Sequence, residues 1–162
     1  QYIGNNPLML KQFSKEFQIE YAKKHLKERG FKKKALRWTK DMGEFTVCFF
    51  LQGSSYNKED YYIRPGVWIN AVGTDSYYGH FITEIQQTTT EAVMTEFDEF
   101  VRIWTDKGHI KRIVDEFLVW DKRNPLEKRR AGEVDYEKDP FPSRVCFSIP
   151  QNAMKFILEH FD

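Results

Sequence analysis

Polar and aromatic residues alternate with apolar ones in three runs between residues 45 and 86, and their types suit recognition. This alternation is the two-residue period of half-buried strands, so one side of each run should face a core. The residues of the other side that could anchor a ligand or partner are Gln52, Tyr62, Arg64, Trp68 and His80. Because a core would not hold Gln, Arg and His without partners, we expect a recognition surface.

Among these residues, His80 has the side chain that could act as an acid or base near neutral pH. On the expected fourth strand it shares a face with Tyr78, Glu84 and Gln86. A strand histidine that is hydrogen-bonded to a neighbour is the more common arrangement. The four histidines lack metal-ligand spacing, and the chain has no nucleophile elbow or phosphate-binding glycine loop. We therefore predict no catalytic residue, no metal site and no cofactor.

The elements that would position this face form an α+β fold, expected as a single domain over residues 1–162. Asn6-Pro7 predicts the start of a first helix and Gly30 its end. Four strand-like runs with short connections then predict an antiparallel four-stranded meander, at about 34–40, 45–55, 61–71 and 77–86. Pro65 in the third run predicts an edge position or a bulge.

Helices are expected after the sheet. A capping box at Thr88–Glu91 and two apolar stripes separated by Gly108 predict two helices that pack on one face of the sheet as a hairpin. The charged segment 121–143, interrupted by Pro and Gly, predicts a loop that is functional or flexible. Residues 145–149 predict a short extra strand, and Pro150 begins a last helix that could cover the second side of the sheet.

Charge is nearly balanced but unevenly distributed. The formal net charge is +1, with a basic block from Lys23 to Lys40 and an acidic block from Glu84 to Asp106. The basic block includes Phe31 and Trp38, and rings beside cations are typical of single-stranded nucleic-acid binding. Lysines at a helix end and a charged edge strand explain the same residues. Because the acidic block offsets the basic one, we do not expect nucleic acid as the partner.

The two cysteines, Cys48 and Cys146, lie far apart in apolar surroundings and lack metal or redox spacing. We expect them to be reduced, buried and in a reducing compartment, so the predicted location is the cytoplasm. No apolar run is long enough to span a membrane. The chain opens at Gln1 rather than Met, so a removed signal peptide or tag stays open.

Several short motifs carry a family resemblance over about residues 8–120. They are Gly30-Phe31-Lys32-Lys33-Lys34 after the first helix, Trp38, Phe49-Phe50-Leu51-Gln52-Gly53-Ser54 and Gly66-Val67-Trp68. In this order they resemble a bacterial group, domain-of-unknown-function family 4304. The resemblance implies the fold and carries no established activity. Small bacterial domains of this style are associated with neutralising toxins by direct binding, which is not a mechanism.

The leading hypothesis is a bacterial interaction module, antitoxin-like in one form, that binds another protein through the aromatic and polar side of the sheet. The alternative is a small-ligand-binding protein or enzyme on the same face, anchored by Gln52, Arg64 and His80. Single-stranded nucleic-acid binding ranks third. A flat exposed patch would favour the first hypothesis, and a deep pocket would favour the second.

Overall fold

The computed structural model describes residues 15–53, 61–75, 77–87 and 89–162, and the side chains from residue 18 onward within these ranges. Helix α2 (Lys15–Glu28) precedes an antiparallel sheet whose five strands follow one another in space in chain order. The strands are β1 (Lys32–Lys34), β2 (Arg37–Asp41), β3 (Phe45–Gly53), β4 (Tyr61–Ile69) and β5 (Phe81–Ile82). Helices α3 (Thr90–Trp104), α4 (Lys107–Arg123), α5 (Leu126–Arg130) and α6 (Gln151–His160) follow, with a 3-10 helix, η2 (Arg144–Ser148), before α6.

The sheet is the expected meander with one more strand. The run predicted at 34–40 splits into β1 and β2 because the chain turns at Ala35, whose φ is 55°. The strand predicted at 77–86 is reduced to β5 and one further bridge between Ile63 and Ile85. Pro65 lies inside β4, where its carbonyl accepts from Thr83 on the β5 side. The Pro65 nitrogen, which carries no hydrogen, therefore also faces β5 and not β3. Because β5 is a short edge strand, few hydrogen bonds of the sheet are lost there.

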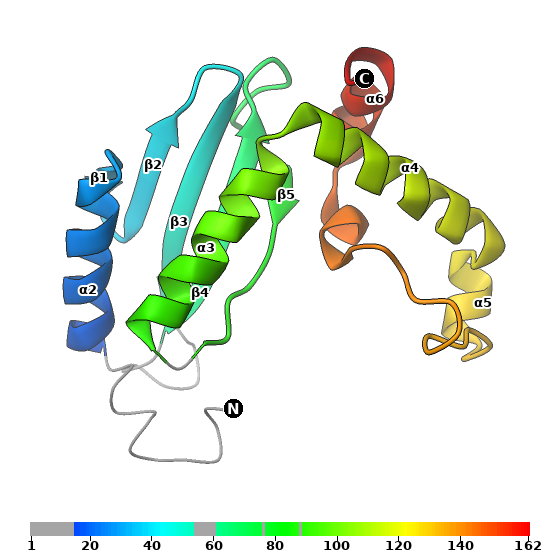
Figure 1. Ribbon diagram of the computed structural model, residues 1–162, viewed down its shortest axis with the longest axis horizontal. Helices are drawn as coiled ribbons and strands as arrows, with labels where there is room; N and C mark the ends of the chain where they lie inside the picture. The colour runs from blue at the N-terminus through cyan, green and yellow to red at the C-terminus, as the bar shows by residue number, and fades with distance from the viewer. Residues whose placement is uncertain (1–14, 54–60, 76, 88) are drawn as a thin grey trace.

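One face of the sheet forms the main core beneath α2 and α3 (Figure 1). The predicted alternation in β3 is confirmed, because the odd-numbered residues from Phe45 to Leu51 are all buried. They meet the buried stripe of α3, and the rings of Phe49 and Phe97 lie edge to face with centroids 5.1 Å apart. Burial of large rings and aliphatic side chains at this face is the main source of stability in the sheet.

Both helix ends that flank the sheet follow the sequence signals. Gly30 has a φ of +86° and ends α2, where the Gly30 and Phe31 amides donate to the Lys27 and Leu26 carbonyls. This is a Schellman motif, and it turns Phe31 back toward the core. Thr89 caps α3 by accepting a hydrogen bond from the Ala92 amide. The predicted start of the first helix at Asn6-Pro7 lies outside the described residues.

The C-terminal helices differ from the predicted hairpin on the sheet. Helix α4 begins at the Asp106 cap and leaves the sheet at an angle, so that of the two helices predicted as a hairpin α3 alone lies along the sheet (Figure 1). The last helix begins after Pro150 as predicted. The strand predicted at 145–149 was wrong, because this stretch is the 3-10 helix η2. Its Phe147 ring packs against Phe117 and Trp120 of α4, and the 3-10 helix also contacts the edge strand β5.

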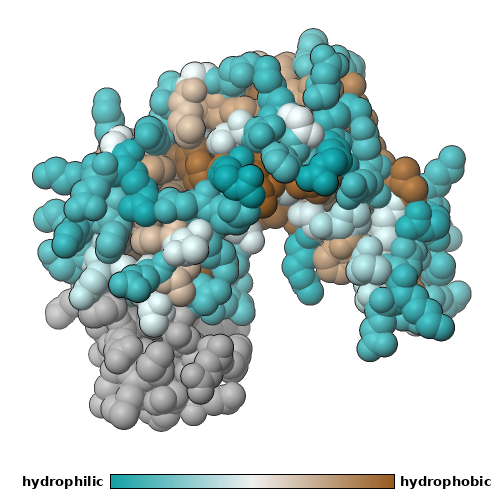
Figure 2. Space-filling view, viewed as in Figure 1, coloured by the Kyte–Doolittle hydropathy of each residue, from teal (hydrophilic) through white to brown (hydrophobic). Residues whose placement is uncertain are grey.

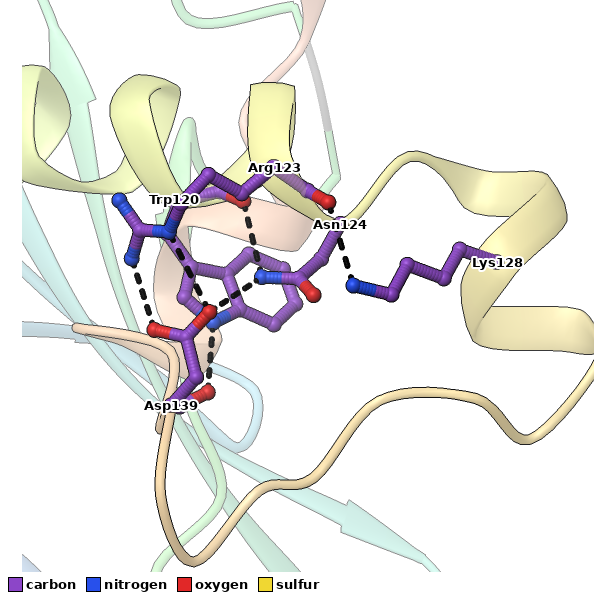
Figure 3. Close-up of polar contacts among 5 residues, drawn as sticks. All are labelled: Trp120, Arg123, Asn124, Lys128 and Asp139. Atoms are coloured by element: carbon purple, nitrogen blue, oxygen red, sulfur yellow. Dashed lines mark hydrogen bonds and ion pairs between the residues drawn. The ribbon is translucent and has the colours of Figure 1, made fainter.

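The loop predicted at 121–143 was also partly wrong, since α4 extends to Arg123 and α5 follows. A side-chain network that joins buried Trp120 and Asn124 to the more exposed Arg123 and Asp139 explains why so polar a segment folds (Figure 3). The Trp120 indole donates to the Asp139 carbonyl at 2.8 Å, and Arg123 and Asn124 both donate to the Asp139 carboxylate. Long-range bonds of this kind leave no short-period pattern in the sequence.

No helix within the described ranges is long and apolar enough to cross a membrane.

The closest backbone approach in the sheet provides the first prediction. A Cβ added to Gly66 would lie 1.8 Å from the Tyr78 carbonyl oxygen. Gly66→Ala should therefore lower the free energy of unfolding by about 3 kcal/mol or more, because two backbones must separate. Gly53→Ala is the control, since among the described residues its Cβ would meet nothing nearer than 3.9 Å. It should change stability by less than about 1 kcal/mol in urea titrations. Equal effects of the two substitutions would contradict the close approach of the Gly66 and Tyr78 backbones.

Candidate functional site

The second face of the sheet, opposite α2 and α3, gathers most of the residues predicted as a site. In the β3–β4 register, Gln52 pairs with Tyr62, Phe50 with Arg64, and Thr46 with Trp68. Side chains that pair across antiparallel strands point to the same face. Gln52, Tyr62, Arg64 and Trp68 therefore share what we call the back face.

The segment between β4 and β5 crosses this face. The Gly79 backbone has a φ of +127°, and a Cβ there would lie 2.9 Å from the Val67 nitrogen. Together with the contact between Gly66 and Tyr78, this brings two backbones into direct contact. The crossing segment leaves Trp68 only 4% exposed and His80 only 3% exposed. These two predicted residues thus lie within the face and not on its accessible surface.

His80 is held by the backbone that it covers. Its amide donates to the Val67 carbonyl at 2.8 Å, and its Nδ1 accepts from the Ile69 amide at 2.9 Å. Burial lowers the pKa of His80 below its ordinary value of 6.5, which favours the neutral ring that this acceptor role needs. His80 is hydrogen-bonded to a neighbour, as in the more common arrangement, but it is buried and lies in the bend just before β5 and not in a strand. It supports the backbone crossing.

The accessible part of the back face is a cluster of arginines and rings, which we call the sheet patch. Its members are Arg37, Phe50, Tyr62, Arg64, Tyr77 and Tyr78. The Arg37 guanidinium lies 4.2 Å from the Tyr77 ring centroid and 4.7 Å from that of Phe50. The Arg64 guanidinium lies 5.3 Å from the Tyr62 ring centroid. Guanidinium groups bind well to ring faces because they are planar and weakly hydrated.

Two polar atoms in or beside the patch lack a hydrogen-bond partner among the residues that the structure describes. They are the Gln52 side-chain oxygen and the Arg64 Nε, and both are shielded from solvent. The Arg64 terminal nitrogen reaches the Glu84 carboxylate only at 3.9 Å. A buried polar group without a partner costs about 1–3 kcal/mol. A ligand group that bonded them after a small side-chain rotation would recover part of this cost.

A shallow groove of about 700 Å³ lies next to the patch, between Arg37 and the start of the crossing segment. Its polar groups mainly bind one another. The Thr46 hydroxyl donates to the Asn70 side-chain oxygen at 2.7 Å, and the Asn70 amide nitrogen donates to the Gly43 carbonyl at 2.7 Å. This groove offers few unoccupied polar groups to a small molecule.

The cysteines predicted to be reduced are free and buried. Burial raises the pKa of Cys48, on the back face opposite Gly66, to about 12, so it stays a neutral thiol. Burial also raises the pKa of Cys146 to about 12. Within the described ranges no three His, Cys, Asp or Glu side chains gather as a metal site. The back face therefore offers recognition chemistry more readily than acid–base or nucleophilic chemistry.

The family model described as a domain of unknown function, DUF4304, matches residues 22–134, which is more than half of the chain. The chain belongs to this family. The resemblance noted from the sequence is thereby confirmed, with a match that begins later and reaches further than the motifs indicated. Searches of curated proteins and of solved structures found no match.

The DUF4304 match covers the whole sheet patch and ends at Val134, just after α5. Because the function of this family is unknown, membership assigns no activity to the chain, and the functional argument rests on the geometry. Sequence reasoning missed Arg37 and Tyr77 as patch residues. Arg37 was assigned to a solvated basic block, and its position opposite Phe50 depends on the β2–β3 register. Tyr77 has no alternation signal, because it precedes β5 in an irregular segment.

The division of the back face into a buried and an accessible part can be tested by paired substitutions. Trp68→Ala should cost about 3 kcal/mol or more in the free energy of unfolding, because it empties a buried volume. Tyr77→Ala, at a side chain that is 60% exposed, should stay within about 1 kcal/mol of the parent. Urea denaturation measures both. A small loss at Trp68 would mean that the crossing segment does not seal the face.

The hydrogen bond to His80 predicts a pH dependence of stability. Because its folded pKa lies below 6.5, the unfolded chain binds more protons as the pH falls below 6.5. The contribution of His80 to stability is thus complete above pH 6.5 and is lost as the pH falls through the folded pKa. His80→Gln keeps an acceptor for the Ile69 amide but cannot titrate. The variant should lose less stability than the parent between about pH 7.5 and 5.5 in urea titrations; parallel curves would contradict this.

Proposed function

We propose that this DUF4304 domain is a recognition module that binds another protein through the sheet patch. The observation that supports this proposal is the pair of arginines stacked on exposed rings on the one sheet face that α2 and α3 leave free. Tyr and Arg are enriched among the energetic anchors of protein interfaces, where rings supply area and guanidinium groups supply directed bonds.

The charge of the patch indicates the chemistry of the partner. Arg37 makes contacts to two rings but no ion pair with any carboxylate in the described part of the chain. The ion pair of Arg64 within the described ranges is the long one with Glu84, at 3.9 Å. Both guanidinium groups keep N–H donors for an acidic side chain while their faces rest on rings. A partner with Asp or Glu beside an apolar residue fits this surface, and a toxin neutralised by direct binding is one partner of this kind.

The alternative of a small-ligand site or an enzyme is supported by the size of the neighbouring groove, about 700 Å³, which lies in the range of ligand pockets. The groove is weaker support for a binding site than the patch is. It is shallow, and its Thr46, Asn70 and Asp41 side chains bind each other. A single-stranded nucleic acid would need a longer row of unpaired cations than Arg37 and Arg64 provide.

The test is a charge reversal in the patch. Tagged parent protein and the variant Arg37→Glu/Arg64→Glu are used to capture proteins from a lysate of the source organism, with quantification by mass spectrometry. We expect an acidic partner that the variant retains about tenfold less, which corresponds to about 1.4 kcal/mol of binding free energy. The same difference should appear in calorimetry with the purified partner.

The matched control is Arg112→Glu/Arg130→Glu, which makes the same change in net charge at exposed positions outside the patch. It should retain the partner as the parent does, and thermal melts of all three proteins should establish that they are folded. A capture profile that the patch variant leaves unchanged would overturn the proposal, and so would equal losses in both variants.

A further inference from the structure

A second surface of arginines and rings lies in the C-terminal part of the chain, mostly beyond the residues matched by the family model. It is a groove of about 730 Å³ lined by Arg129, Tyr136, Pro140, Phe141, Arg144 and Phe147. We call it the C-terminal groove. Five of its six lining residues follow Val134, where the family match ends.

The groove is built on a fixed base. Trp120 is buried beneath it, and its indole donates to the Asp139 carbonyl. The Asp139 carboxylate accepts from Arg123 and Asn124 on the other side (Figure 3). The hydrogen bond from Arg123, and next that from Asn124, lowers the pKa of Asp139, so the carboxylate stays charged. Pro140 and Phe141 are thereby held beside the end of α4.

The rings of the groove stand nearly perpendicular to one another. Tyr136 and Phe141 meet at 82°, and Phe141 and Phe147 meet at 76°. Tyr136 is 46% exposed and Phe147 is 44% exposed, although both contact the buried Trp120. Perpendicular rings with open faces form slots that suit a proline or aliphatic side chain, as in grooves that bind extended peptides.

The two arginines of the groove differ in whether their guanidinium groups are already bonded. Arg129 is committed, because its Nε donates to the Asn124 carbonyl and its terminal nitrogen pairs with Asp121 at 2.7 Å. Arg144 lies over the Phe141 ring at 5.4 Å and has no ion pair with any carboxylate that the structure describes. One cation thus remains available at the edge of the aromatic slots.

We propose that the C-terminal groove binds an extended peptide segment of another protein, with a proline or aliphatic residue between the rings and a neighbouring carboxylate on Arg144. Charge complementarity decides between a peptide and a single-stranded nucleic acid, whose bases would also stack on these rings. Glu133, Asp135 and Glu137 are exposed on the stretch that carries Tyr136. They repel a row of phosphates, whereas a single carboxylate needs only Arg144.

This site is separate from the sheet patch in residues and in chain segment, so each can fail alone. The probes are fluorescein-labelled synthetic decapeptides with either Pro-Pro-Leu-Pro or Leu at the centre, each made with a neighbouring Glu or Lys. Fluorescence anisotropy measures their affinity for the full chain. The NMR signal of the Trp120 indole N–H, assigned with Trp120→Phe, reports contact at the base of the groove.

We expect at least one Glu peptide to bind about tenfold more tightly than its Lys counterpart and to shift the Trp120 signal. Arg144→Ala should abolish this preference for Glu, while Arg130→Ala, an exposed arginine outside the groove, should keep it. Tyr136→Ala should weaken all the peptides, and Tyr136→Phe should retain binding. The sheet-patch variant Arg37→Glu/Arg64→Glu should bind the peptides as the parent does.

The proposal is overturned if no peptide binds at about 1 mM, the weakest affinity of interest for such a segment. It is also overturned if the Glu and Lys peptides bind equally, or if an oligothymidine probe binds more tightly than every peptide. Thermal melts of the Arg144 and Tyr136 variants separate loss of binding from loss of folding.

Discussion

The back face depends on the crossing of two backbones at Gly66 and Gly79. Neither position has room for a Cβ, and Gly79 adopts a conformation that side chains rarely take. Where the chain crosses, Trp68 and His80 are buried. The crossing also places Tyr77 against the Phe50 ring and Tyr78 near the Arg64 guanidinium. Without this contact the second face would be an ordinary solvent-exposed sheet.

The crossing also explains how one face can be partly buried and partly accessible. A sheet of this size covered on one side is stable enough to leave the other side partly open. Trp68 and His80 are buried, and Arg37 and Arg64 stay accessible. The Nδ1 of buried His80 accepts a hydrogen bond from the Ile69 amide, so this ring nitrogen is paired. By contrast, the Gln52 side-chain oxygen and the Arg64 Nε have no hydrogen-bond partner among the described residues.

The sequence predicted the sheet face beneath α2 and α3 well, and the back face only in part. Alternation in β3 and the caps at Gly30 and Thr89 are short-range signals, and the structure follows them. The shared face of Gln52, Tyr62 and Arg64 also follows from the two-residue period. The burial of Trp68 could not be read in this way, because it depends on an irregular segment that returns over β4. The folding of 121–143 was missed for the same reason, since bonds from Asn124 to Asp139 join distant residues.

The sheet patch and the C-terminal groove use the same physical device in unrelated parts of the chain. In each, a guanidinium group rests on a ring face, which orients it without consuming its N–H donors, whereas an ion pair would consume them. Arg129 is the contrast, because its pairing with Asp121 fixes it as part of the framework. A chain with almost no net charge can in this way present two local cationic sites. In both proposals, the affinity for a carboxylate would depend on the rings beneath the arginines more than on the total charge of the protein.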